Sequence, residues 1–278
     1  MLAMSWLRSR RAATIRSRLN VILETRMIDI DERIGIPESA ICLFAHPDDP
    51  DFICGGTLAR WADGGCRITY VLMTDGRAGV QGLGDTPISD ADLVAMRQRE
   101  QREAAAIIGA HDVVFFDHRD GELIHTLELR RQLVREIRRA RPQAAILFDP
   151  QRRVMPGYVQ HPDHWTSGEA ALAALFPLSG NRRTFVELAD EGLTPHQVQD
   201  IYLVSAMSPN LRIDITDVIE RKLRAMSCHR SQVGDPETLG DRMRGMSRQA
   251  AGASGMEYAE QFHFLRFGAR DLALDALV

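Results

Sequence analysis

Short apolar runs alternate with longer amphipathic stretches from about residue 40 onward, a pattern typical of strands alternating with helices. The runs predicted as strands are 41–45, 66–74, 112–116, 144–149, 200–206 and 211–215, with a last strand near 261–267. The stretches predicted as helices are 55–65, 91–109, 127–140, 164–176 and 216–229. This alternation predicts an α/β fold with a Rossmann-like, mostly parallel sheet and helices on both faces.

The length of 278 residues fits one domain of this class, and we expect that domain to span 41–278. Residues 1–40 are predicted to be an N-terminal helical extension, in which arginines interrupt the apolar positions. Such a helix packs on the domain or on a neighbouring subunit, which favours a homo-oligomer; a transit peptide and a membrane-surface helix are the alternatives. The stretch 234–255 is rich in Gly, Ser and Met and is predicted to be irregular.

Composition narrows the class of protein. A formal net charge of −4 does not favour binding to nucleic acid. No apolar run is long enough to cross a bilayer, so we expect no transmembrane segment. The four cysteines are scattered without a CxxC pair, which argues against a disulfide framework and a thiolate metal site and fits a cytoplasmic protein.

Polar residues follow the predicted strands at the point where each strand ends. The strand over 41–45 runs into His-Pro-Asp-Asp at 46–49, and the strand over 144–149 leads to His-Pro-Asp-His at 161–164. Parallel sheets bind their ligands at the carboxyl ends of the strands. The two histidine–carboxylate clusters are therefore predicted to meet at one edge of the sheet.

Imidazole nitrogen and carboxylate oxygen without sulfur suit zinc, or another divalent ion such as Fe2+, at a catalytic site. A catalytic zinc takes three protein ligands and lowers the pKa of water to about 7, while a carboxylate that does not bind the metal serves as general base. The alternative for each cluster is a helix start capped by aspartate. The glycine-rich stretch 75–82 matches neither phosphate-binding motif and is interpreted as a flexible loop at the site.

The residues also resemble a known family, the PIG-L/LmbE-type N-deacetylases, and within it the diacetylchitobiose-deacetylase-like branch. The resemblance is carried by AHPDDPDFICGGTLARWADGG at 45–65, RDGEL at 119–123 and HPDH at 161–164. Further segments that match lie at 74–76, 97–100, 141–150, 214–232 and 257–266. The resemblance implies a zinc-dependent hydrolase that removes an N-acetyl group from a small N-acetylglucosamine-type substrate.

Site residues carry over position by position. His46, Asp49 and His164 match the three zinc ligands. Asp48 matches the general base, and His161 matches the histidine that steadies the oxyanion and protonates the leaving amine.

Arg97 and Asp120 match residues that grip sugar hydroxyls, and Tyr158 lies three residues before His161, within predicted reach of a substrate. The alternatives are a surface ion pair for Arg97 and a turn residue for Asp120. The chain departs from many relatives at Pro50-Asp51, where they carry a Glu-type residue; Asp51 is a candidate for a supporting or N-cap role.

Two other functions stay open at this point. One is a non-catalytic sugar-binding protein that keeps the fold, against which the intact set of predicted ligands and base argues. The other is a different metallohydrolase, such as a phosphoesterase, although two-metal phosphoesterases need more ligands than the one clean set visible here.

Overall fold

A computed structural model describes residues 28–29 and 34–267 of the chain. The predicted amphipathic helix in the first 27 residues lies outside the described residues. None of the helices in the described part is both long enough and apolar enough to cross a bilayer.

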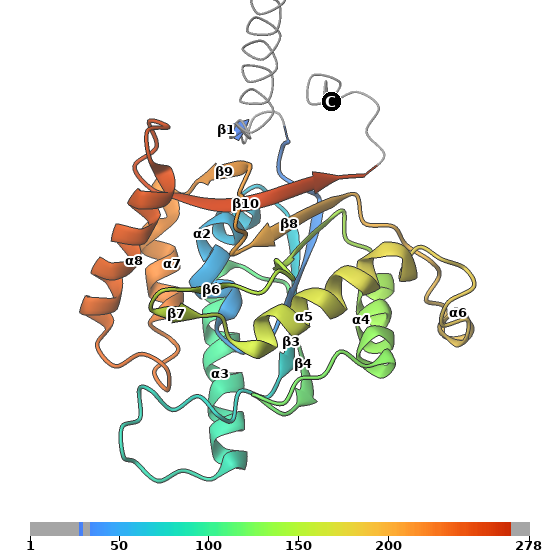
Figure 1. Cartoon of the computed structure of the whole chain (residues 1–278), viewed down its shortest axis with the longest axis horizontal. Helices are drawn as coiled ribbons and strands as arrows, with labels where there is room; N and C mark the ends of the chain where they lie inside the picture. The colour runs from blue at the N-terminus through green and yellow to red at the C-terminus, as the bar shows by residue number, and fades with distance from the viewer. Residues whose placement is uncertain (1–27, 30–33, 268–278) are drawn as a thin grey trace, which may run out of the picture.

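The described chain forms one main sheet with helices on both faces (Figure 1). From edge to edge, its strands are β1 (Ile28–Asp29), β9 (Leu211–Asp214), β10 (Ala259–Arg266), β8 (Asp200–Val204), β5 (Ala144–Phe148), β2 (Ser39–Phe44), β3 (Arg67–Thr74) and β4 (Asp112–His118). The pairs from β8 to β4 are all parallel, whereas β10 runs antiparallel to both β8 and β9. The predicted mostly parallel α/β fold is confirmed.

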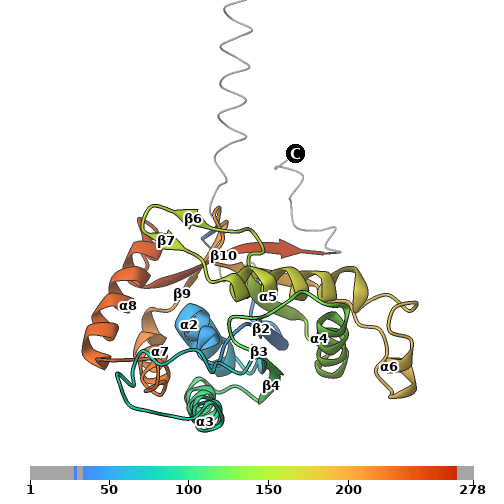
Figure 2. The same cartoon turned by 60° about the horizontal axis from the view of Figure 1, so that its bottom comes forward.

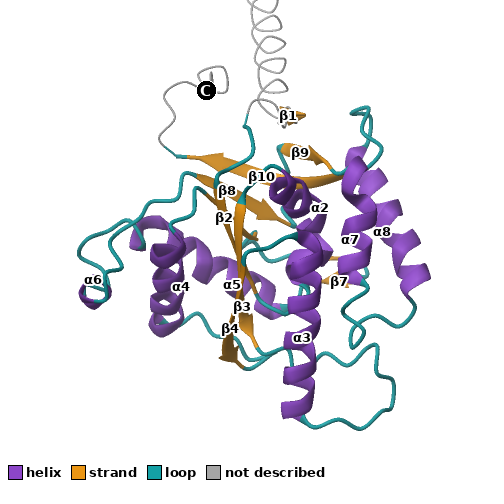
Figure 3. Cartoon of the chain, turned by 180° about the vertical axis from the view of Figure 1, so that it is seen from behind, coloured by secondary structure: helices purple, strands orange, loops and turns teal. Residues whose placement is uncertain are grey.

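Alternating residues of the central strands divide the core into two layers. The helices on one face are α2 (Asp49–Asp63), α3 (Asp90–Ile108) and α7 (Ile219–Met226), and those on the other are α4 (Leu127–Ala140) and α5 (Pro162–Ala173) (Figure 3). In β2, Cys42 and Phe44 pack into the first layer, while Ile41 and Leu43 pack into the second. Because both faces are covered, the central strands are mostly apolar on both faces.

The remaining elements are the hairpin β6 (Val154–Met155) and β7 (Tyr158–Val159), the π-helical turn η1 (Ala174–Leu178), α6 (Glu187–Asp190), the 3-10 turn η2 (Thr216–Val218) and α8 (Pro236–Ala251). The hairpin connects β5 with α5 and was not predicted. The predicted helices over 164–176 and 216–229 each divide into an α-helix and a short turn of another type.

The prediction of an irregular segment over 234–255 is wrong, because most of it forms α8. Asp235 caps this helix by accepting hydrogen bonds from the backbone N–H groups of Glu237 and Thr238. The buried positions include the small residues Gly240 and Ser247, so a composition typical of loops here serves close helix packing.

Helix α2 begins at Asp49, earlier than the predicted start at 55, and a kink explains the difference. Cys54 has non-helical backbone angles of φ −134° and ψ 20°, which free the N–H groups that follow it. Those of Gly56 and Thr57 donate to the buried carboxylate of Glu260, at 3.0 and 2.8 Å. Lys222 balances this carboxylate at 2.7 Å. The predicted helix corresponds to the second half of α2.

Candidate active site

The two histidine–carboxylate clusters come together at the carboxyl ends of the strands. The first lies where α2 begins and the second where α5 begins (both helices are labelled in Figure 2). The turn at 46–49 joins β2 to α2, and the turn at 161–164 opens α5. Loops that follow β3 and β4 bring Gly76 and Asp120 to the same edge.

The donor groups of the three predicted ligands form a compact triangle. His164 Nε2 lies 3.2 Å from His46 Nδ1 and 3.2 Å from an Asp49 oxygen, and His46 Nδ1 lies 3.5 Å from the other Asp49 oxygen. Donors bound to zinc at tetrahedral angles lie about 3.4 Å apart. The spacing and the chemistry of this donor set therefore fit one divalent ion.

The electrostatics of the triangle agree with a cation site. Burial alone would raise the pKa of the Asp49 carboxyl, but the neighbouring His164 and His46 lower that pKa far below its ordinary value. Burial lowers the pKa of His46, whereas the carboxylates of Asp120, Asp163 and Asp49 raise it more, so that it lies well above the ordinary value. Several carboxylates thus surround one imidazole, an excess of negative charge that a divalent cation would balance.

The opposite edge of the His46 ring is held by a second pair of carboxylates. His46 Nε2 lies 3.2 Å from Asp120 Oδ1 and 3.3 Å from Asp163 Oδ2. Asp163 is itself fixed by the backbone N–H groups of Gly121 and Leu123, which donate at 2.7 and 3.3 Å. A histidine that binds a metal through one nitrogen commonly donates its other N–H to a carboxylate in this way. Two groups among the described residues have donor atoms close enough together to hold an ion: His46 with His161 and His164, and His46 with Asp120 and Asp163.

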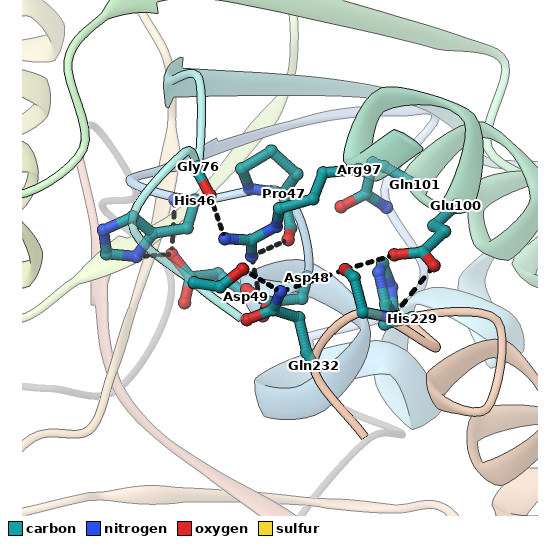
Figure 4. A network of polar contacts seen from close by, with 12 residues as sticks. His46, Pro47, Asp48, Asp49, Gly76, Arg97, Glu100, Gln101, His229 and Gln232 are labelled. Atoms are coloured by element: carbon teal, nitrogen blue, oxygen red, sulfur yellow. Dashed lines mark hydrogen bonds and ion pairs between the residues drawn. The ribbon is translucent and has the colours of Figure 1, made fainter. Parts of the chain in front are cut away.

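Asp48 lies beside the triangle in a backbone conformation that is rare for a residue other than glycine, with φ 139°. Arg97 Nη2 donates to the Asp48 carboxylate at 3.0 Å (Figure 4). Burial raises the pKa of Asp48 and Arg97 lowers it, with a net shift upward. A carboxylate with a raised pKa is a better proton acceptor near neutral pH.

Arg97 is buried, with 3% of its surface exposed, so the alternative of a surface ion pair is wrong. Besides Asp48, its guanidinium donates to the carbonyl oxygens of Gly76, at 2.7 Å, and Pro47, at 2.6 Å (Figure 4). Gly76 has φ +71°, and a Cβ there would lie 2.8 Å from the guanidinium, so this close approach requires glycine. Arg97 therefore fastens the turn at 46–49 to the loop after β3.

His161 adopts one tautomer when its ring is neutral. Its Nδ1 accepts a hydrogen bond from the backbone N–H of Asp163 at 3.2 Å, which leaves the proton on Nε2. Burial and the neighbouring His46 lower the pKa of His161. The His161 and His46 rings meet edge to face with centroids 4.6 Å apart, so His161 lies next to the triangle.

The sequence and the fold are similar to those of known proteins. Residues 41–175 match the profile of the family described as PIG-L, GlcNAc-PI de-N-acetylase. The chain is 33% identical over 242 residues to the diacetylchitobiose deacetylase of Thermococcus kodakarensis, an alignment that covers 85% of this chain and 86% of the relative. The chain belongs to the PIG-L/LmbE deacetylase family.

Other proteins similar to this PIG-L/LmbE chain also carry the name of a deacetylase. A probable N-acetyl-alpha-D-glucosaminyl L-malate deacetylase 2 of Bacillus anthracis is 29% identical, with 69% of this chain and 80% of that protein aligned. The solved structure of N,N'-diacetylchitobiose deacetylase from Pyrococcus horikoshii, in complex with the inhibitor MPG, superposes with a TM-score of 0.77 at 29% identity. That superposition covers 90% of this chain and 92% of the other. As a family member, the chain is an N-deacetylase, that is, an amide hydrolase.

Two of the predicted substrate-binding residues of this PIG-L/LmbE deacetylase lie in different surroundings. Asp120 is buried, and its second oxygen accepts a hydrogen bond from Ala78 N at 3.3 Å, so both oxygens have partners within the protein. Tyr158 lies on the exposed hairpin, 44% exposed, where the ring packs near the guanidinium of Arg153. Sugar binding by Arg97, Asp120 and Tyr158 stays a prediction.

Two residues that support the PIG-L/LmbE site were not predicted from the sequence. Asp163 orients His46, and its place inside the HPDH cluster was the signal. Phe148 stacks on the ring of His164 with centroids 4.0 Å apart and planes inclined by 14°. Phe148 ends β5, and only the folded structure shows that it lies under α5.

Proposed function

We propose that this chain is a zinc-dependent deacetylase that hydrolyses the N-acetyl group of an N-acetylglucosamine-type sugar, with diacetylchitobiose as the first candidate. The observation that carries the proposal is the triangle of His46 Nδ1, the Asp49 carboxylate and His164 Nε2, with Asp48 directly beside it. The names of the relatives from Thermococcus kodakarensis and Bacillus anthracis support the substrate class.

His46, Asp49 and His164 would hold the metal. When bound, the ion supplies Lewis-acid polarisation of the amide and lowers the pKa of water. The chemistry of the donor set, nitrogen and oxygen without sulfur, favours zinc, and Fe2+ is the alternative.

Asp48 accepts the proton of the water that attacks the amide carbon. Arg97 fixes this carboxylate through its hydrogen bond, so that one oxygen remains for the water. The raised pKa of Asp48 strengthens it as a proton acceptor.

The Nε2–H of His161 donates to the oxygen of the amide as negative charge develops there. The proton that Asp48 accepted from the water then passes to the leaving nitrogen as the C–N bond breaks, which yields acetate and the free amine.

The test is to incubate the purified protein with diacetylchitobiose or N-acetylglucosamine and to quantify acetate and free amine together. We expect equal amounts of both, loss of activity on chelation and recovery when zinc is added. Bound metal is measured on the same sample, and one ion per chain is expected.

The outcomes separate the alternatives. Acetate release without metal dependence would contradict the zinc mechanism. Metal binding without hydrolysis of any acetylated amino-sugar in a panel would contradict the substrate class. Hydrolysis of a phosphate ester with two bound ions would point to a phosphoesterase instead.

A further inference from the structure

A buried polar network lies behind the turn at 46–49 and takes no part in the mechanism above. At its centre is Asp51, which has no exposed surface. Asp51 accepts hydrogen bonds from Gln101 Nε2 at 2.7 Å and from His229 Nε2 at 2.9 Å, and Tyr70 lies at 3.5 Å. Since a carboxylate only accepts hydrogen bonds, the ring nitrogen of His229 is the donor. We call these four residues the anchor network.

The catalytic turn needs support because its backbone is strained. Asp48, with φ 139°, occupies a conformation that persists only where the surrounding structure enforces it. The carbonyl oxygen of Asp48 accepts hydrogen bonds from the N–H groups of Asp51 and Phe52 at 3.0 and 3.1 Å. The position of Asp51 is thereby coupled to the peptide that aims the Asp48 carboxylate.

The turn is held from two sides. Arg97 binds Pro47 O and the Asp48 carboxylate (Figure 4). Gln101, one helical turn further along α3, binds Asp51. His229 adds a contact from a segment 178 residues away in sequence. Because Asp51 is fully buried, a lost donor is not replaced by bulk water, and its carboxylate would have to shift.

His229 is itself well fixed. Its side chain is buried, and its ring lies against Phe52, with centroids 5.9 Å apart. Two residues further on, Ser231 donates from N and Oγ to the buried Glu100 at 3.0 and 2.6 Å. Gln232 Nε2 donates to Gly79 O at 2.8 Å. Residues 229–232 therefore reach the catalytic turn with one side chain and the loop after β3 with another.

We propose that His229 is a positioning residue for the deacetylation: through Asp51 it holds the strained Asp48 turn in its active orientation. The inference rests on the proposed function. Because the side chain of His229 bonds to Asp51 and not to a predicted metal ligand, its loss lowers kcat and leaves KM nearly unchanged. Gln232 holds a loop at the rim instead, so Gln232→Leu raises KM more than it lowers kcat.

The experiment compares His229→Leu, His229→Gln and a matched control, His196→Leu. The His196 side chain is partly buried, and its Nε2 donates to Pro142 O at 2.7 Å. Pro142 precedes β5 and so lies at the amino ends of the strands, away from the site. For each variant, kcat, KM, bound metal and the melting temperature are measured. His229→Leu is expected to lose about tenfold to hundredfold in kcat with metal retained.

His229→Gln is expected to recover most of the rate, because its amide also donates to Asp51. His196→Leu is expected to lower the melting temperature without lowering kcat. An unchanged kcat in His229→Leu, an equal loss of kcat in the control, or loss of the metal from His229→Leu would each overturn the proposal.

A crystal structure of His229→Leu separates this inference from the proposed function. We expect Asp48 to leave its positive φ or to lose its contact with Arg97. If both are retained, the inference is wrong whatever the substrate is. If the turn moves and the wild type hydrolyses no amide, the positioning effect stands and the proposed reaction fails.

Discussion

The two turns at 46–49 and 161–164 share the tripeptide His-Pro-Asp, yet the structure places their side chains differently. In the second turn His161 is the N-cap, with φ −58° and ψ 135°, and α5 begins at the next residue. In the first turn Asp48 is the N-cap, with positive φ, and α2 begins only at Asp49. The helix thus starts two residues later relative to the histidine.

This shift changes what each side chain faces. His46 lies ahead of its helix and points into the donor triangle, whereas His161 caps its own helix and His164 supplies the nitrogen to the triangle. Asp48 keeps 21% of its side chain exposed, but its counterpart Asp163 keeps only 1% and binds His46. The position at which the helix starts, rather than the tripeptide itself, therefore determines which side chain faces the metal site.

The largest effect is expected for Asp48→Asn, which removes the predicted general base of the first turn. The amide keeps the size of the side chain but cannot accept the proton of water, so we expect kcat to fall by about 10²–10⁴. Bound metal should stay at the wild-type level, as measured by elemental analysis. A variant that kept full activity would show that another group is the base.

Asp163→Asn tests the other aspartate and should have a smaller effect. Removing the charge that orients His46 is expected to weaken metal affinity by about 10–100-fold, because partners behind a ligand tune its binding. The measurement is a competition titration with a chelator. If metal affinity were unchanged while kcat fell as far as in Asp48→Asn, Asp163 rather than Asp48 would be acting on the substrate.

Phe148→Leu tests whether the stacked ring holds His164 of the second turn in place. It removes the ring stacked on His164 and should cost about 1 kcal/mol of stability, with a modest loss of metal affinity. The matched control is Phe44→Leu, since Phe44 packs edge to face against Phe148 with centroids 5.1 Å apart. Equal metal affinity in both variants would show that the stack does not hold His164.

The smallest effect concerns an ordinary N-cap, Asp235 of α8, as a reference for the strained Asp48. Hydrogen bonds from the Thr238 side chain and from the backbone of Thr238 and Glu237 lower the pKa of Asp235. A lowered pKa means that the cap stabilises the fold above the ordinary value of about 3.9, and that this stabilisation is lost as pH falls through the lowered pKa. Asp235→Ala should therefore lower the melting temperature slightly at neutral pH, and the difference from wild type should vanish in acid. A difference that persisted in acid would contradict this origin.

Much of the fold was predictable because its strands are buried on both faces and read as apolar runs. Helix α4 lies over 127–140 as predicted, where capping by Thr126 and a regular apolar stripe agree. The prediction for 234–255 was wrong because small residues in a packed helix resemble those of a loop. The early start of α2 was not predicted because its kink is capped by Glu260, some 200 residues away in sequence.

The site was predictable only where its residues are neighbours in sequence. Each turn is recognisable in the sequence by its histidine and carboxylates after a strand. The structure brings the predicted ligand and base residues of both turns together. The supporting contacts of Phe148 and His229 depend on packing between distant segments, which no local pattern encodes. The homo-oligomeric state and the cytoplasmic location stay predictions from the sequence.

The two sides of the His46 ring provide the most direct test, because Nδ1 faces the predicted ligands Asp49 and His164, whereas Nε2 faces Asp120 and Asp163, a second possible ion site. A crystal structure of the zinc-loaded protein, with zinc located by anomalous scattering, decides between them. We predict one ion at about 2.0–2.2 Å from His46 Nδ1, an Asp49 oxygen and His164 Nε2, with Asp48 not bound to it. An ion on His46 Nε2 with Asp120 and Asp163 would contradict the account.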